Sequence, residues 1–421
     1  MEMILEFLRD VLSQPALLIG IMSCVGLIAL KRPFHKIMTG TLKPILGYLM
    51  LAAGAGVIVS NLDPLGKMIE HGFHITGVVP NNEAIVAVAQ KVLGVETMSI
   101  LVVGLLMNLL IARFTKFKYV FLTGHHSLFM ACLMSAVLGT AGLSGIELIL
   151  VGGFLMGAWS AISPAIGQSY TSKVTDGDEI ALGHFGSLGY YLSAWVAKYV
   201  GKAEESTEDI EIPEKWGFLR DSTLSTALTM IVFYLIAAIA AGSEFVATLS
   251  GSMSPYLFAI MSAMNFAVGV AIVYSGVRMI LGDLIPAFQG IATKIIPNAI
   301  PAVDCAVFFT YAPTAVVLGF ISSFIGGIIG MLILGAVGGV LIIPGLVPHF
   351  FCGATAGIYG NATGGRRGAA VGAFLNGLAI TFLPALALPV LGQLGFQNTT
   401  FGDADFAVIG LVLGNAFEWI G

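Results

Sequence analysis

Polar side chains able to bind a hydroxylated small molecule occur where this sequence is otherwise apolar. Asp304 stands inside the run Ala-Val-Asp-Cys-Ala-Val-Phe of residues 302–308, and His125 and His184 each follow a glycine that leaves room for close approach. A carboxylate accepts hydrogen bonds from hydroxyls, and a neutral imidazole offers one donor and one acceptor. These residue types together suit a polyol or an enediol.

Each of these residues also has a structural interpretation. Asp304 fits the N-cap of a short helix, where its charge suits the helix dipole, and this role is compatible with binding. Histidines in such places are often structural, and on a helix the adjacent His125 and His126 face about 100° apart, so at most one is expected to line a given site. No HExxH and no Cys/His cluster has ligand spacing, and the four cysteines are scattered through apolar runs, so neither a metal nor a cofactor is expected.

Two segments are too polar or too interrupted to be simple membrane spans. The first, 64–96, contains Val-Pro-Asn-Asn-Glu-Ala at residues 79–84, and the second, 286–305, contains three prolines. Irregular backbone persists at membrane depth only where protein or a water-filled cavity covers it, and matching interruptions in two halves point to a transporter's binding site. The alternative is an ordinary loop outside the membrane. This alternative fits the second segment less well, because apolar runs lie close to Asp304.

The composition defines the elements that must position these residues. Of 421 residues, 57% are hydrophobic and only 10% are charged. A span needs roughly 20 mostly apolar residues, and about eleven runs approach this length, which predicts an all-α polytopic membrane protein. No Walker A loop, GxSxG or strand-associated GxGxxG is present, so the sequence offers no catalytic motif. The expected spans are 15–30, 41–62, 98–113, 119–140, 146–168, 223–242, 255–279, 306–324, 326–345, 369–392 and 404–420.

Basic residues predict the orientation. They follow the first and third spans and precede the tenth, as Lys31, Arg32, Lys36, Arg113, Lys116, Lys118, Arg366 and Arg367. If these loops are cytoplasmic, the N-terminus lies outside and the C-terminus inside. The five spans before a hydrophilic linker then have the opposite orientation in the membrane from the five spans after it. This relation is expected of an inverted-repeat transporter. The expected organisation is a first repeat at 1–170, a cytoplasmic amphipathic and acidic linker at 171–222, a second repeat at 223–392 and a C-terminal transmembrane helix at 393–421.

Several motifs distributed almost end to end carry a family resemblance. They are Leu122-Thr123-Gly124-His125, Val174-Thr175-Asp176-Gly177, Gly183-His184, Gly201-Lys202 with Glu204-Glu205-Ser206 and Glu208-Asp209, Gly276-Val277-Arg278-Met279, Ala302-Val303-Asp304-Cys305-Ala306, Ala312-Pro313 with Ala315-Val316-Val317, and Ile342-Ile343-Pro344-Gly345. Together they resemble the integral membrane component, enzyme IIC, of the ascorbate-type branch of the bacterial phosphoenolpyruvate-dependent sugar phosphotransferase system.

The resemblance implies a fold, a mechanism and partners. The fold is a homodimer of protomers with about eleven transmembrane helices, built as inverted five-helix repeats with re-entrant hairpins. Each protomer has a V-motif dimerisation domain and a core domain that carries the substrate in an elevator motion. A separate cytoplasmic enzyme IIB, supplied by enzyme IIA, holds the phosphoryl-transfer residue, so this chain is a transport subunit in the bacterial cytoplasmic (inner) membrane. The bilayer surrounds it, and no nucleic acid is involved.

The resemblance also implies site residues, and this chain departs from the family pattern at several of them. Phe129 and Phe185 stand where glutamines are expected, Ala55 where a serine is expected, and Glu83 where a tyrosine is expected. The two phenyl rings are expected to stack on a sugar, and Glu83 to bind hydroxyls, so the substrate is L-ascorbate or a related sugar or polyol. The backbone around Gly54–Gly56 and the loop Asn81–Glu83 should approach it. The expected site residues are His125, His184, Asp304, Glu83, Asn82, Ala55, Phe129 and Phe185.

Two other classes of protein remain alternatives. One is an ion-coupled secondary transporter of the same fold, with Glu83 and Asp304 as coupling carboxylates, one in each half. The other is a multispan membrane enzyme or scaffold, for which the sequence supplies no chemistry. Phosphorylation of the accumulated substrate distinguishes the phosphotransferase interpretation from the ion-coupled one.

Overall fold

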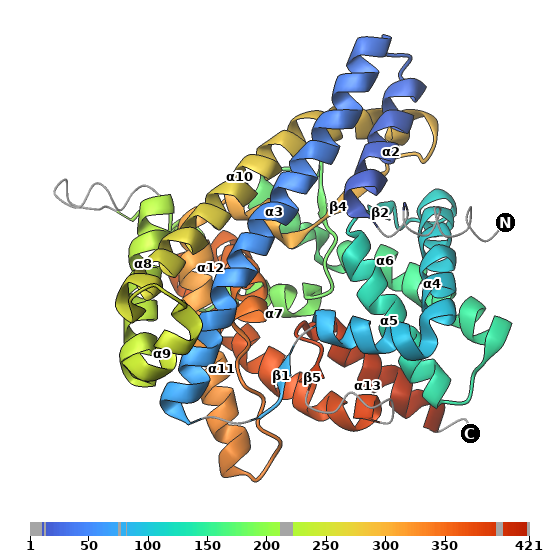
Figure 1. Ribbon diagram of the computed structural model, residues 1–421. Helices are drawn as coiled ribbons and strands as arrows, with labels where there is room; N and C mark the ends of the chain where they lie inside the picture. The colour runs from blue at the N-terminus through green and yellow to red at the C-terminus, as the bar shows by residue number, and fades with distance from the viewer. Residues whose placement is uncertain are drawn as a thin grey trace.

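The computed structural model describes residues 11, 14–74, 77–80, 82–210, 222–392 and 399–418, and this part of the chain is mainly helical (Figure 1). Six of its helices are long and apolar enough to cross a membrane. A seventh candidate span is the pair Thr226–Ala241 and Ser243–Ser250, which is bent by 117°. These helices agree with the predicted polytopic helical membrane protein, while the number of eleven spans stays a prediction.

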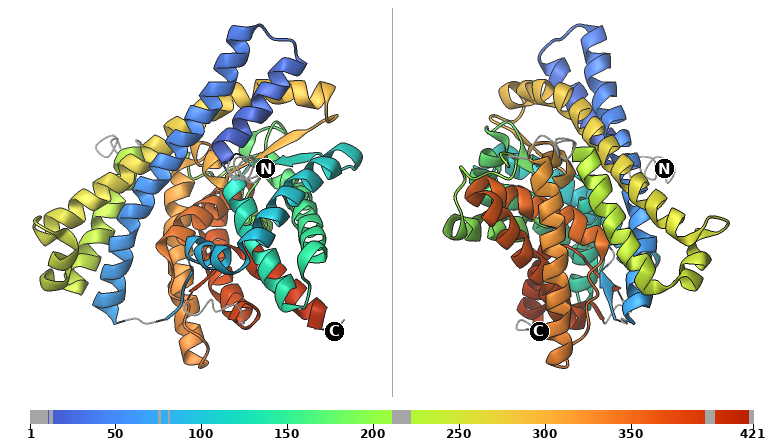
Figure 2. Two further views of the ribbon diagram at one scale, coloured as in Figure 1. Left: turned by 45° about the vertical axis from the view of Figure 1, so that its right-hand side comes forward. Right: turned by 90° about the vertical axis from the view of Figure 1, so that its left-hand side faces the viewer.

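Two helices of 40 residues each, α3 (Phe34–Phe73) and α10 (Pro255–Lys294), lie side by side across the molecule (Figures 1 and 2). They meet at glycines: a Cβ added to Gly47 would lie 2.8 Å from the carbonyl oxygen of Gly276, and one added to Gly54 would lie 2.7 Å from that of Gly269. Since the contacts ascend along one helix and descend along the other, the helices are antiparallel. Around them pack α2 (Pro15–Ala29), α8 (Ser222–Ala241) and α9 (Ser243–Ser250).

Neither long helix breaks at an internal proline, of which α3 has two (Pro44 and Pro64) and α10 has one (Pro286). The sequence predicted an interruption beginning at residue 64, but α3 passes through Pro64 and ends at Phe73, and α10 passes through Pro286. Proline deprives carbonyls one turn earlier of their usual partner. The carbonyl that loses its helical donor at Pro64 is that of Ser60, and the Tyr234 hydroxyl of α8 donates to the adjacent carbonyl, that of Asn61. Neighbouring helices can thus stabilise a proline within a membrane helix.

The remaining helices form the other part of the molecule. They are α4 (Asn82–Phe114), α5 (Gly124–Thr140), α6 (Gly145–Thr175), α7 (Ser187–Val200), α11 (Pro313–Ala336), α12 (Leu346–Gly392) and α13 (Ala404–Glu418). The spans expected at 306–324 and 326–345 are a single helix, α11. The helix α12 begins 23 residues before the span expected at 369–392 and kinks at Gly364–Gly365, where Gly365 has a φ of 58°. A positive φ suits glycine, and it divides α12 into two helical parts.

Short parallel strands arrange the helix starts. One sheet has the order β2 (Tyr119–Phe121), β4 (Ile300–Val303) and β3 (Ala181–Leu182). The other pairs β1 (Val79–Pro80) with β5 (Thr399–Thr400), and Val78 bridges to Ile342 beside it. Parallel strands present their carboxyl ends on the same side. Therefore α5, α7 and the short 3₁₀ helix η2 (Cys305–Thr310) begin together after one sheet, and α4, α12 and α13 begin together after the other.

The region expected as a linker, 171–222, contains regular structure. Here α6 continues to Thr175, β3 joins a sheet, and α7 buries one face with Tyr190 and Tyr191. The segment 201–210 packs on the kink of α12, where the backbone N–H of Thr207 donates to the Asn361 side chain at 2.8 Å. Paired backbone and buried aromatics explain why this polar sequence is folded. Residues 211–221 lie outside the described part of the chain.

Candidate functional site

Asp304 stands at the start of η2 and uses its two carboxylate oxygens differently. Its Oδ1 accepts the backbone N–H of Ala306 at 3.0 Å, which is the predicted capping role. Its Oδ2 lies 3.4 Å from Nε2 of His125, whose Nδ1 lies 3.1 Å from the hydroxyl of Tyr48 in α3. The capping interpretation and the pocket interpretation therefore apply to different atoms of one side chain.

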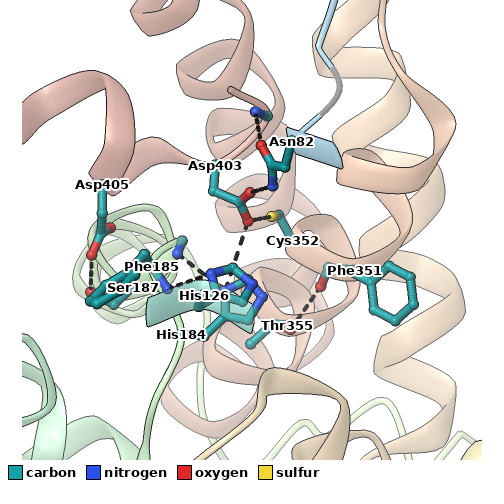
Figure 3. A network of polar contacts seen from close by, with 12 residues as sticks. Asn82, His126, His184, Phe185, Ser187, Phe351, Cys352, Thr355, Asp403 and Asp405 are labelled. Atoms are coloured by element: carbon teal, nitrogen blue, oxygen red, sulfur yellow. Dashed lines mark hydrogen bonds and ion pairs between the residues drawn. The ribbon is translucent and has the colours of Figure 1, made fainter. Parts of the chain in front are cut away.

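A second polar group gathers around Asp403, just before α13 (Figure 3). The Asn82 amide donates to its Oδ2 at 2.6 Å, and the Cys352 thiol donates to its Oδ1 at 2.9 Å. Asn82 also accepts the backbone N–H of Gly402 at 2.9 Å, which fixes the start of α4 to the segment before α13. His184 Nδ1 lies 3.8 Å from Asp403 Oδ1. Two predicted residues, Asn82 and His184, are thus joined through a residue that was not predicted.

The imidazoles of His126 and His184 lie against each other, with ring centroids 3.8 Å apart. Nδ1 of His126 accepts the backbone N–H of Phe185 at 3.4 Å, and Nδ1 of His184 accepts that of Gly186 at 3.1 Å. The Tyr190 hydroxyl lies 2.9 Å from the same His184 nitrogen. Because both Nδ1 atoms accept, the neutral rings carry their proton on Nε2.

The positions of the protons on these two histidines determine whether the site can bind a metal. His126, His184 and Asp403 have ligand atoms within 4.8 Å of one another, a donor set known for transition metals. A metal would need an unprotonated ring nitrogen, and each Nδ1 is already engaged by a backbone N–H while each Nε2 carries the proton. As hydrogen-bonded here, the three side chains offer two N–H donors and a carboxylate acceptor. They fit hydroxyl groups better than a cation.

The two phenylalanines that replace expected glutamines lie in different surroundings. Phe129 borders the histidines, with its ring centroid 5.7 Å from that of His125 and 5.5 Å from that of His126. Phe185 is 0% exposed and stacks on Phe121 with centroids 4.6 Å apart. Its backbone N–H holds His126, and its buried ring lies with its centroid 6.1 Å from that of His126.

The other predicted positions are only partly described. Asn81 lies outside the described residues, as do the side chains of Ala55 and Glu83, although Ala55 belongs to α3 and Glu83 to the first turn of α4. Gly54 faces α10, whereas a Cβ on Gly56 would meet nothing within 4 Å.

Sequence reasoning missed Asp403, His126 and Cys352 at this site. A signal for Asp403 was present, because it precedes the apolar run 404–420 much as Asp304 precedes its own apolar run. His126 was set aside in favour of its neighbour, since adjacent helical residues face apart. In the structure, His125 contacts Asp304 and His126 contacts His184, so both histidines belong to the candidate site.

Replacing Phe185 with Gln is expected to destabilise the protein. The amide would enter the cluster around Phe121 and Phe406, whose ring centroid is 5.8 Å from that of Phe185, and burying an unpaired amide costs roughly 1–3 kcal/mol. Phe185→Leu, which keeps the site apolar, is the control. Thermal unfolding in detergent measures both, and a Gln variant as stable as the Leu variant would mean that the amide finds a partner.

An apolar, multispan helical body that encloses converging polar helix starts defines a membrane transport protein. The family model described as "PTS system sugar-specific permease component" (EIIC-GAT) matches residues 10–405, and the chain belongs to this family. The predicted resemblance is thereby confirmed. The "Ascorbate-specific PTS system EIIC component" of Mycoplasma pneumoniae is 26% identical over 417 aligned residues, which cover 85% of this chain and 62% of that protein. This chain thus spans less than two thirds of the length of that relative.

Proposed function

We propose that this chain binds L-ascorbate or a related sugar or polyol and moves it inward as the permease of a phosphotransferase system. The observation that carries the proposal is the meeting of Asp304, His125 and His184 where helices from distant parts of the sequence begin. Ionisable groups inside a membrane protein are costly and are usually retained for function. Carboxylate acceptors beside imidazole donors match a hydroxylated substrate.

We further propose that the fold is an inverted repeat. In support, the order of elements after α3 recurs after α10. The corresponding elements are β1 with β4, α4 with η2 and α11, β2 with residues 341–343, α5 and α6 with the two parts of α12, β3 with β5, and α7 with α13. On this reading the first repeat extends beyond residue 170 to Val200, and the C-terminal helix belongs to the second repeat.

An elevator mechanism in a homodimer is part of the same proposal. The antiparallel pair α3–α10 with α2, α8 and α9 would be the fixed V-motif, and the helices around the polar site would move. In support, the polar contact between Tyr48 of α3 and His125 of α5 connects these two parts at the site. Apolar side chains exposed on α3 and α8, such as Leu46 and Ile239, suit a bilayer or a second protomer.

Phosphorylation would require partners. A cytoplasmic enzyme IIB, supplied by IIA, would transfer the phosphoryl group at the inner face of the bacterial cytoplasmic membrane. The basic residues at 31–36, 113–118 and 366–367 would face inward, which leaves the N-terminus outside and the C-terminus inside.

Two measurements test the proposal. Calorimetry on purified protein in detergent, with ascorbate and galactitol as ligands, should give saturable binding of at least one of them. In cells that supply the partner IIB and IIA, the accumulated substrate should be phosphorylated. Accumulation of unmodified substrate would instead favour the ion-coupled transporter.

Replacing His184 with Ala should weaken that binding about tenfold or more, because a donor in the site is lost. Tyr190→Phe is the matched variant: it removes the hydroxyl that contacts His184 Nδ1 at 2.9 Å and leaves the imidazole. Its affinity should change less than that of His184→Ala. Wild-type affinity in His184→Ala would remove His184 from the site.

A further inference from the structure

We propose that Asp403 and His126 belong to the substrate site and that Asp403 selects an uncharged polyhydroxyl compound over an anion. The inference rests on the proposed function, because it concerns the same site. It starts from the position of Asp403, which contacts Asn82 directly and lies 3.8 Å from His184. Neither Asp403 nor His126 was expected from the family pattern.

The Asp403 carboxylate has hydrogen-bond acceptor positions that the described protein groups do not fill. The side chain is only 4% exposed, yet a carboxylate can accept about four hydrogen bonds. Two donors are present, the Asn82 amide on Oδ2 and the Cys352 thiol on Oδ1. The nearby His184 Nδ1 accepts a backbone N–H and so does not donate to the carboxylate. A substrate hydroxyl can fill the remaining positions.

His126 and His184 provide the complementary donors. Each carries its proton on Nε2, and neither Nε2 has an acceptor within the described part of the chain. The described side-chain polar atoms that are both fully enclosed and without a partner include Thr123 Oγ1 and Ser163 Oγ. Neither histidine Nε2 is among them, so each keeps some exposed surface. The Nε2–H donors of the two histidines lie beside a carboxylate with unfilled acceptor positions. This arrangement matches neighbouring hydroxyl groups, each of which both donates and accepts.

The charge of the site favours an uncharged ligand. In the described residues, the ion-pair contacts of Asp304 and Asp403 are with histidines, and no Lys or Arg pairs with either. Two carboxylates in a buried site repel a third negative charge, and the repulsion is strong where water is excluded. Ascorbate is an anion at neutral pH, whereas galactitol is uncharged and carries only hydroxyls.

Asp403→Asn separates charge from shape. It keeps the size of the side chain and an oxygen for the Asn82 amide, but it removes the negative charge. Galactitol affinity should fall about tenfold to a hundredfold, because a charged acceptor is lost. Ascorbate affinity should either rise or fall by a smaller factor than galactitol affinity does. The ratio of the two affinities should therefore move at least about tenfold toward ascorbate. Calorimetry in detergent at neutral pH measures both.

Asp405→Asn is the matched control. Asp405 lies two residues away and is 0% exposed, and its oxygens accept from Ser187 at 2.7 Å, Leu188 N–H at 2.9 Å and Trp159 at 3.2 Å. Three donors of the protein already bind its carboxylate, one more than at Asp403, so this variant should lose stability and keep the affinity ratio. His126→Phe, which keeps a ring against Phe406, should weaken galactitol binding about tenfold while the protein stays folded.

The outcomes separate the two proposals. Wild-type protein that binds neither probe would overturn the proposed function and this inference with it. Wild-type binding with an unchanged ratio in Asp403→Asn, or wild-type protein that binds only ascorbate, would overturn the inference alone. If Asp403→Asn does not fold, His126→Phe decides: galactitol affinity equal to that of the wild type in this variant would overturn the inference.

Discussion

Asp304→Asn is expected to weaken substrate binding about tenfold to a hundredfold while leaving a folded protein. Asparagine is as good an N-cap as aspartate, so the bond to the Ala306 N–H is kept at the start of η2. The charge that faces His125 at 3.4 Å is lost. Hydrogen bonds to charged groups contribute roughly 1.5–3 kcal/mol, which corresponds to this range of affinity.

Asp304→Ala is the comparison that separates the two roles of this residue. Alanine removes the cap as well as the charge, and loss of an N-cap costs about 1 kcal/mol of stability. The Ala variant should therefore unfold at a lower temperature than the Asn variant, although both bind poorly. If the Asn variant binds substrate like the wild type, Asp304 acts as a helix cap only.

The sequence indicated residues of the candidate site, because costly polar groups stand out in an apolar chain. Asp304, His125, His184 and Asn82 were identifiable from motif and context, and the structure brings them to helix starts beside two small sheets. What could not be predicted was which residues meet across the molecule. Asn82 and Asp403 are 321 positions apart, and their contact depends on the pairing of β1 with β5.

The helix boundaries differ from expectation for a physical reason. Hydropathy measures transfer into lipid, and it treats every apolar run as a span and every proline as an interruption. Pro64 does not end α3, and a helix far along the chain contacts the backbone beside it, where Tyr234 donates to the carbonyl of Asn61. The aromatic segment of α7 reads as linker by its polar flanks, yet Tyr190 is fully buried. Both outcomes depend on tertiary contacts, which local composition does not contain.

Gly54→Ala is expected to destabilise the protein, whereas Gly56→Ala in the same helix is not. The new methyl at residue 54 would lie 2.7 Å from the carbonyl oxygen of Gly269, a backbone atom that cannot move without displacing α10. Overpacking of this kind costs about 1–3 kcal/mol. At Gly56 nothing lies within 4 Å, and Ala is the better helix former by up to about 1 kcal/mol. Thermal unfolding in detergent should therefore shift in opposite directions.

The same comparison can be made from the facing helix, which tests whether the crossing itself is responsible. A methyl at Gly276 would lie 2.5 Å from the carbonyl oxygen of Gly47, whereas Gly282 of α10 has open space. Gly276→Ala should thus behave like Gly54→Ala, and Gly282→Ala like Gly56→Ala. Because each pair shares a helix and a substitution, helix propensity cancels and only the approach of the two backbones remains. Equal stability within both pairs would mean that the long helices do not cross at these glycines, and the close antiparallel contact between α3 and α10 would have to be abandoned.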